Sequence, residues 1–410
     1  MQPQRKHIAL LLLMFLLSAI VTVSFLNVNP TSSSSSLQIA KGASLLWEKT
    51  YGGTGDDRCF YAANAGSGYV IVGSSTSFEL GKTVAWIVRL DPDGNALWNR
   101  TYNENSGSEF RYVISLDDGF LLVGNTFTVS GGTDGYVVKI DNNGNPLWNI
   151  TLQTGSGVNK LFSAAKTQGD FVLVGLTEPA GNGNSQIWLV KIDANGNVIW
   201  NRTFGGSLDS AGRGVTLTQD GCYMVAGYTD DTANLDYDFL VLKIDTAGTL
   251  LWNRTYGGPE SDKAYAIAPA AGGCVITGDT RSKGAGESDA WVIRIDLNGS
   301  LLWDRTVGGK GFDAPTCITL LPNGDYLVGG ITFSFGNGQR DFWLFKVDDA
   351  GKVLWSCTVG RSNYEEAYAV VQNAEDLFPD NKFVMAGWTN SIGQGKYDFY
   401  VVKIEDASGD

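Results

Sequence analysis

The chain has 410 residues, a formal net charge of −13 and one histidine, and 52 of its residues are glycine. A body this acidic repels phosphate backbones, so nucleic-acid binding is not expected. The histidine, His7, lies in the N-terminal leader, which excludes Ser-His-Asp catalysis, Cys-His catalysis and histidine-ligated metals in the main body.

The first 28 residues predict a membrane segment. Arg5 and Lys6 precede residues 8–28, a stretch of 21 mostly apolar or small residues. About 20 apolar residues can span a bilayer, whereas the apolar part of a cleaved secretory signal is usually about 7–15 residues long. We therefore expect a signal anchor at 1–28 that ties the protein to the membrane through an N-terminal helix, with a cleaved signal peptide as the alternative. The basic residues place the body outside the cytoplasm, and the serine-rich residues 29–44 form a tether.

From residue 45 the sequence repeats. A motif close to LLWNRTYGG returns seven times, with its tryptophans 50, 51 or 52 residues apart. A repeat of this length predicts one array of similar units rather than several domains. We expect the tryptophans to pack between neighbouring units; they are Trp47, Trp98, Trp148, Trp200, Trp252, Trp303 and Trp355.

Each repeat contains four short apolar segments separated by Gly, Asn, Asp or Ser, the pattern of strands and tight turns. One turn recurs as D-x-x-G, for example at 91–94 and 296–299, where Asp caps the turn and Gly adopts a positive φ. The sequence therefore predicts an all-β fold, a seven-bladed β-propeller with four antiparallel strands per blade at 45–406. Residues 407–410 form a short tail.

The two ends of the repeat region predict how the propeller closes. The region begins with a fourth-strand motif at 45–50 and ends with a third-strand motif at 398–406. The last blade therefore lacks its outer strand, and the N-terminal strand can supply it. This closure removes open sheet edges, which otherwise promote aggregation.

These motifs also resemble a known group. SDAWVIRIDLNGSLLWDRTVGG at 288–309 and LPNGDYLVGGIT at 321–332 resemble the repeat of secreted bacterial and archaeal seven-bladed propeller proteins. The resemblance covers 45–406 and implies a propeller at the cell surface without catalytic activity. KIDANGNVIW at 191–200 more distantly resembles the tryptophan-docking repeats of PQQ-like propellers, the quinoprotein dehydrogenases, which usually have eight blades.

Carboxylates gather in the links between one blade and the next. Four of them hold the same offset from the position of the Gly-Gly pair in the repeat, and a fifth lies in the same kind of link. A ring of carboxylates at the channel mouth would hold Ca²⁺ or contact sugar hydroxyls, whereas the alternative is that each one caps its own turn. Beyond Ca²⁺ no cofactor is expected. The candidates are Asp57, Asp262, Asp313, Glu365 and Asp209.

Five N-x-S/T sequons are present, four of them within the W-N-[RI]-T motif. Glycans there would suit an exported protein, although duplication of the repeat would also copy an accidental sequon. The candidates are Asn99, Asn149, Asn201, Asn253 and Asn298.

The loops between the second and third strands differ most from repeat to repeat, for example 74–85 and 332–341, and expose Phe78, Phe333 and Phe335. Such loops on a rigid scaffold are common binding surfaces. The five cysteines form no CxxC pair, and we expect most of them to be small core residues.

Together these features predict an extracytoplasmic, non-enzymatic binding module that presents its variable loops to a polysaccharide, a surface protein or a divalent ion. Three alternatives remain open. They are a carboxylate-based carbohydrate-active enzyme, a quinoprotein-like dehydrogenase and a structural component of the surface coat.

Overall fold

The computed structural model describes residues 38–39, 43–103, 106–155, 157–179, 183–206, 208–230, 236–372 and 381–406. These residues form 29 strands and no helix, which confirms the all-β prediction. Among them no helix has the length and apolar character needed to cross a membrane. The predicted leader at 1–28, most of the tether and the tail at 407–410 lie outside the described residues.

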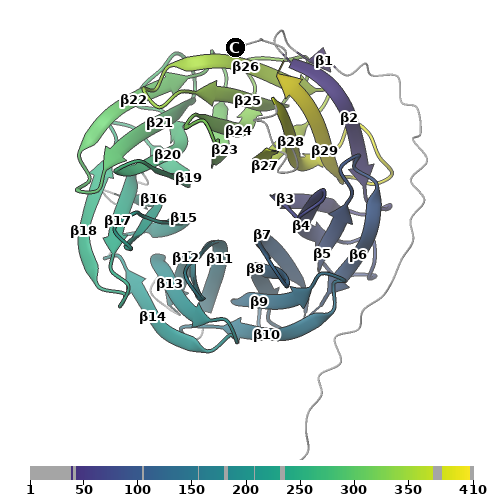
Figure 1. Ribbon diagram of the computed structural model, residues 1–410, viewed down its shortest axis with the longest axis horizontal. Coiled ribbons are helices and arrows are strands. Elements are labelled where there is room, and N and C mark those ends of the chain that lie inside the picture. The colour runs from purple at the N-terminus through teal and green to yellow at the C-terminus, as the bar shows by residue number, and fades with distance from the viewer. Residues whose placement is uncertain are drawn as a thin grey trace, which may run out of the picture.

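The strands form short antiparallel sheets around a central opening (Figure 1). Sequence-consecutive strands pair in each sheet, because tight turns join neighbours along the chain. The first sheet contains β3 (Asp57–Asn64), β4 (Tyr69–Ser75), β5 (Val84–Leu90) and β6 (Ala96–Tyr102). A single parallel bridge, Thr133 with Val158, joins the next two sets of four. Those sets are β7 (Ser108–Leu116), β8 (Gly119–Phe127), β9 (Thr133–Asp141) and β10 (Pro146–Leu152), then β11 (Gly157–Lys166), β12 (Asp170–Pro179), β13 (Gln186–Asp193) and β14 (Val198–Phe204).

The pattern continues through the second half of the chain. The following sheets are β15 (Ser210–Leu217), β16 (Tyr223–Asp230), β17 (Tyr237–Ile244) and β18 (Leu250–Tyr256), then β19 (Asp262–Ala270), β20 (Gly273–Thr280), β21 (Asp289–Asp296) and β22 (Leu301–Val307). After them come β23 (Asp313–Leu320), β24 (Tyr326–Thr332), β25 (Asp341–Val347) and β26 (Val353–Gly360), with β1 (Gln38–Ile39) paired on β26. The innermost strands contact one another in order around the opening, β27 with β3 included.

The last sheet combines both ends of the described chain. It contains β27 (Glu365–Gln372), β28 (Lys382–Thr389), β29 (Asp398–Asp406) and β2 (Ala43–Tyr51). Strand β2 pairs antiparallel with β29, with Trp47 opposite Lys403 and Thr50 opposite Tyr400. Strand β2 therefore occupies the outer position of this sheet.

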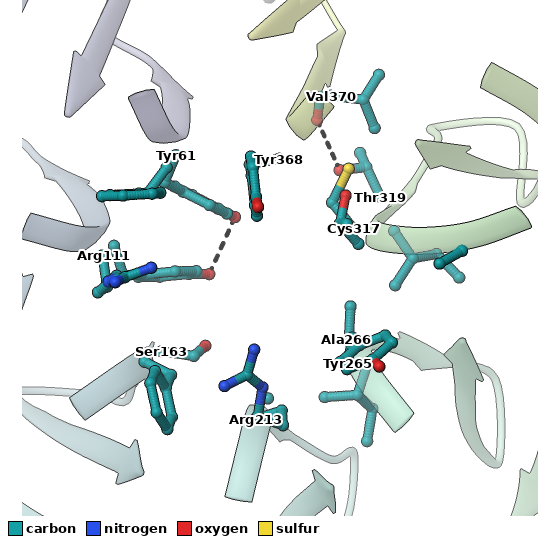
Figure 2. A pocket seen from close by; sticks show the side chains of 18 of the residues that line it. Tyr61, Arg111, Ser163, Arg213, Tyr265, Ala266, Cys317, Thr319, Tyr368 and Val370 are labelled. Carbon is teal, nitrogen blue, oxygen red and sulfur yellow. Dashed lines mark hydrogen bonds between the residues drawn. The ribbon is translucent and has the colours of Figure 1, made fainter. Parts of the chain in front are cut away.

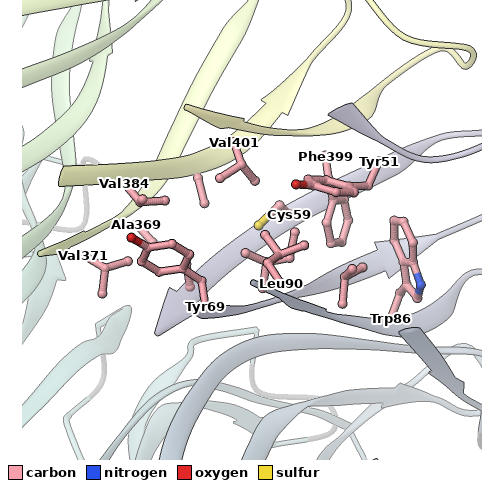
Figure 3. Close-up of a cluster of buried hydrophobic side chains, with 14 residues drawn as sticks. Tyr51, Cys59, Tyr69, Trp86, Leu90, Ala369, Val371, Val384, Phe399 and Val401 are labelled. Carbon is pink, nitrogen blue, oxygen red and sulfur yellow. The ribbon is translucent and has the colours of Figure 1, made fainter. Parts of the chain in front are cut away.

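The apolar core lies between neighbouring sheets. Figure 3 shows one such cluster, in which Cys59 lies among side chains from both sides of the joint between the last sheet and the first. Members of this cluster include Tyr51, Trp86 and Phe399, all buried. Four cysteines are buried and one is half-buried, and none forms a disulfide within the described residues. The four buried cysteines therefore act as small core residues, and Cys222 does not.

The recurring outer tryptophan joins each sheet to the next. Trp252 in β18 donates its Nε1 hydrogen to the Leu297 carbonyl, 3.2 Å away, in the β21–β22 turn. Gly299 of that turn has a φ of 81°, and a Cβ there would lie 3.1 Å from the Trp252 ring. Glycine is thus required both for the left-handed backbone and for the close approach of the indole. Four other tryptophans make the same bond at 3.0–3.3 Å: Trp47, Trp148, Trp200 and Trp303.

Trp355 differs from the others because no covalent turn links the two strands it faces. It lies beside the last sheet, 6.1 Å from Phe383 between ring centroids. Strands β29 and β2 of that sheet are not consecutive in sequence. The Trp355 Nε1 is buried and has no hydrogen-bond partner among the described residues. The corresponding tryptophans bond to a carbonyl of the turn between the third and fourth strands of the next sheet, and no such turn joins β29 to β2.

This difference gives a matched pair of substitutions. Trp252→Phe removes an indole hydrogen bond, so we expect it to lower the free energy of unfolding by about 1 kcal/mol more than Trp355→Phe does. Both changes remove the same volume, and the second also removes an unpaired buried donor. Urea denaturation of both variants measures the difference, and equal losses would contradict the account.

Candidate functional site: the channel cavity and its mouth

The predicted carboxylate ring lies beneath the blade links rather than on an open surface. Asp57, Asp262, Asp313 and Glu365 are completely buried at the first residue of their inner strands. Each accepts a hydrogen bond from the backbone N–H four residues earlier, at 2.8, 2.9, 2.7 and 2.9 Å respectively. Asp209 instead accepts the Ser185 N–H at 2.6 Å. This geometry is that of turn capping.

A second set of buried carboxylates approaches the first. A Cβ on Gly308 would lie 1.9 Å from Asp289 Oδ1 and 3.0 Å from Asp313 Oδ2, so both carboxylates border this glycine. The Oδ1 atoms of Asp289 and Asp341 are buried and have no hydrogen-bond partner among the described residues. The same residues contain no group of three or more His, Cys, Asp or Glu that could hold a metal. A Ca²⁺ ion would therefore need carbonyl oxygens or water as further ligands.

Burial at these joints raises the pKa of two carboxyl groups, those of Asp341 and Asp398. Desolvation raises the pKa of Asp341 to about 6, and the charge of Glu365 adds to the rise. Desolvation likewise raises the pKa of Asp398 to about 6, next to Asp57. Both acids carry a cost when they ionise, because a buried carboxylate is poorly solvated.

The sequon asparagines have a structural role of their own. Asn201 Oδ1 accepts a hydrogen bond from the Nε1 of Trp188 at 2.8 Å, and Asn99 accepts one from Trp86 at 3.4 Å. In other sheets Asp304 fills this position for Trp291, at 3.0 Å. An acceptor beside the outer tryptophan therefore satisfies a buried indole in the third strand. Asn149, Asn201, Asn253 and Asn298 are exposed, and their glycosylation stays a prediction.

Sequence reasoning missed the ring of residues that faces the channel. In every inner strand the pairing register shifts once, around the sixth residue of β11 and around the fourth residue of the other six, the mark of a β-bulge, which re-aims a side chain. All of these bulge residues line a central cavity of about 310 Å³. Their types break the repeat symmetry, and comparing this column between repeats would have revealed it. The ring consists of Phe60, Arg111, Phe162, Arg213, Tyr265, Thr316 and Tyr368.

Aromatic rings and one neutralised arginine form part of the cavity wall. The Arg111 guanidinium lies 3.9 Å from the Phe60 centroid and forms two hydrogen bonds to Glu109, at 2.7 and 2.9 Å. The hydroxyl oxygens of Tyr61 and Tyr112 lie 3.2 Å apart, and a dashed line from Tyr61 marks this hydrogen bond in Figure 2. Burial raises the pKa of both tyrosines, which keeps them neutral hydrogen-bonding groups.

Basic side chains meet aromatic rings on the side of the sheets that carries the variable loops. We call this set the aromatic–basic face. Arg58 lies 4.4 Å from the Tyr397 centroid, Lys263 lies 4.1 Å from that of Tyr237, and Arg340 lies 4.7 Å from that of Phe333. Three further rings complete it: Trp388, Tyr228 and Tyr364.

Exposure varies among the aromatic residues predicted for the loops. Phe333 and Phe335 are 41% and 43% exposed. Phe78 is half-buried, because its ring packs 4.9 Å from that of Trp86. Phe333 and Arg340 also line a pocket with Glu287, Gly311 and Phe312.

Comparison with known proteins supports a propeller with PQQ-like repeats. Residues 133–317 match the sequence model of the family described as outer membrane protein assembly factor BamB. Regulatory protein FlaEY of Caulobacter vibrioides is 24% identical over 225 residues, 46% of this chain. The matched part spans about a quarter, 24%, of that curated relative.

Solved structures resemble the fold at low identity. An alpha-L-arabinanase of Penicillium chrysogenum, complexed with arabinobiose, is 12% identical, with a TM-score of 0.51 over 88% of this chain and 98% of its own. A puromycin hydrolase S511A mutant is 14% identical, with a TM-score of 0.53 over 85% of this chain and 52% of its own. At these identities the likeness concerns the fold alone.

The raised pKa of Asp341 leads to a prediction about how stability depends on pH. The folded-state pKa of Asp341, about 6, exceeds its ordinary value of 3.8. The folded state therefore holds more protons between these values, and this residue's contribution to stability falls as pH rises from about 4 to about 6. Asp341→Asn should raise the free energy of unfolding at pH 7 by roughly 1 kcal/mol, allowing for solvent screening, and the gain should vanish near pH 4.

Asp313→Asn is the matched control. Both Asp313 oxygens accept hydrogen bonds, from Gly309 N–H at 2.7 Å and the Thr332 hydroxyl at 2.5 Å, so the amide should destabilise the fold at pH 7. Urea denaturation from pH 4 to pH 7 measures both variants. A loss at Asp341→Asn, or a gain independent of pH, would refute this interpretation.

Proposed function

We propose that this chain is an extracytoplasmic, membrane-anchored, non-enzymatic binding module, built as a closed seven-bladed propeller, whose loop-bearing face takes a polysaccharide. The seven tryptophan repeats and the pairing of β2 with β29 support the blade count and the closure. The single parallel bridge between β9 and β11 is then a contact between two blades rather than the core of one larger sheet.

The aromatic–basic face is the observation that carries the proposal. Aromatic rings offer flat apolar surfaces on which sugar rings can stack. Arg58 pairs with Asp56 and Arg340 pairs with Glu366, and the N–H groups that these pairs do not use remain donors for sugar hydroxyl groups. Three basic side chains, Arg58, Lys263 and Arg340, each lie beside two aromatic rings here. Within the described residues these clusters occur in some sheets only, so the fold itself does not require them.

The carboxylates favour binding over hydrolysis. A glycosidase of the usual kind needs two carboxyl groups on either side of an open substrate site. Asp57, Asp262 and Asp313 are instead buried and accept hydrogen bonds from their own turns. A protein partner is the second candidate, and the match of residues 133–317 to an assembly-factor family favours it.

Replacing Phe333 tests the polysaccharide proposal. Phe333→Ala in the full chain should weaken binding to the bound member of a polysaccharide panel about fivefold to tenfold, because one stacking contact is lost. Leu302→Ala, at a side chain 54% exposed on the outer strand β22, is the control and should bind normally. Affinity electrophoresis measures both variants. No binding to any polysaccharide, or equal binding by both variants, would favour the protein partner or a structural coat role.

Surface glycosylation is a separate part of the proposal. Thr203→Ala removes the sequon at Asn201 but leaves the Asn201 side chain to accept the Trp188 hydrogen bond. We expect the protein from its native host to lose one glycan mass, without a change in stability beyond that of a surface substitution. Intact-protein mass spectrometry decides the point, since an unchanged glycan mass would argue against modification at Asn201.

A further inference from the structure

The central cavity contains an arginine that has no counter-ion among the described residues. Of the described ionisable side chains that line the cavity, two are arginines and none is a carboxylate. Arg111 is neutralised by its bidentate contact with Glu109. For the Arg213 guanidinium, by contrast, the described part of the chain provides no ion pair and no hydrogen bond, only the ring of Phe162 at 4.3 Å and that of Tyr265 at 5.7 Å.

Comparing the two arginines shows what Arg213 lacks. Both occupy the bulge position of an inner strand, in β7 and in β15. The residue two positions earlier is Glu109 for Arg111 but Ala211 for Arg213, and Ala211 is completely buried. The carboxylate that neutralises the first arginine therefore has no equivalent at the second.

The position of Arg213 makes this charge available to a ligand. Figure 2 shows its side chain pointing into the middle of the cavity, between Ser163 and Tyr265. A half-buried guanidinium is stabilised by an anion that accepts two of its parallel N–H bonds, and a carboxylate has that geometry. One unneutralised cation matches one negative charge, which favours a monocarboxylate over a phosphate dianion.

The rest of the wall indicates the body of the ligand. Val215, Ile267, Ile318 and Val370 lie on the lining, together with the rings of Phe60 and Phe162. A cavity of about 310 Å³ is at the small end of ligand pockets, which range over roughly 300–1,000 Å³. Walls that combine these apolar and aromatic groups with tyrosine and threonine hydroxyls, and one guanidinium directed into the cavity, suit a small acid whose body is apolar or aromatic.

We propose that the central cavity is a binding site for a small monocarboxylate with an apolar or aromatic body, and that Arg213 binds its carboxylate. The site is separate from the aromatic–basic face. It therefore does not depend on the polysaccharide proposal, and either can fail without the other.

Phenylacetate and its neutral amide, phenylacetamide, test the charge requirement on the unmodified full chain. Saturation-transfer NMR and calorimetry should show phenylacetate binding at least tenfold more tightly than the amide. Galacturonate, which carries the same carboxylate on a hydroxylated body, should bind more weakly than phenylacetate. Equal binding of acid and amide, or no binding of either, would overturn the proposal. Tighter binding of galacturonate or of inorganic phosphate would overturn the assigned ligand class.

Substitution locates the site. Arg213→Met should weaken phenylacetate binding at least tenfold and leave the binding of phenylacetamide unchanged. Arg202→Met, an exposed arginine on the outer strand β14, is the matched control and should bind phenylacetate like the unmodified chain. Undiminished binding by Arg213→Met would place the acid elsewhere and refute the assignment. If that variant fails to fold in a thermal melt, the acid–amide comparison on the unmodified chain still decides.

Discussion

The joint between one sheet and the next is the interaction on which the whole structure depends. A four-stranded sheet alone cannot bury both of its faces, and each sheet here does so only against its two neighbours. The outer tryptophan fixes that contact at two points, because its ring lies on a turn glycine of the next sheet and its N–H bonds to a carbonyl of the same turn. Trp200 makes both contacts, with Gly248 and with the Thr246 carbonyl, while Asn201 beside it accepts a hydrogen bond from Trp188 within their own sheet.

Because the joints hold the ring, residues elsewhere are free to differ. The second and third strands of each sheet are almost continuously buried, as in β4 and β25, and their residues are mostly apolar. The bulge position of the inner strands and the loops of the aromatic–basic face have no such constraint, since neither forms a joint. Arg213 and Phe333 lie in these two regions. The regular part of the repeat therefore explains the fold, and the irregular part is where ligands are expected to bind.

The sequence predicted the all-β repeat architecture well, because a period of about 51 residues and the D-x-x-G turns are local signals. The sequence located carboxylates in the links between one blade and the next. It could not decide whether they form an open ion site or buried turn caps. That distinction depends on which way Asp57 and Asp313 turn beneath the Gly-Gly pair. The ring of bulge residues that lines the central cavity was not predicted. No sequence motif marks the β-bulge that turns Arg213 toward the cavity. The role of Asn201 as an acceptor for Trp188 was likewise hidden, since the two lie on different strands.

Hydrogen–deuterium exchange of the full chain, with and without a saturating polysaccharide, tests the central claim most directly. The account predicts slower exchange in the loops at 74–85 and 332–341 and at the ends of the inner strands β3, β23 and β27. The outer strands β6, β18 and β22 should exchange as in the free protein. Protection confined to the outer strands would contradict the claim that one loop-bearing face of the ring carries the function.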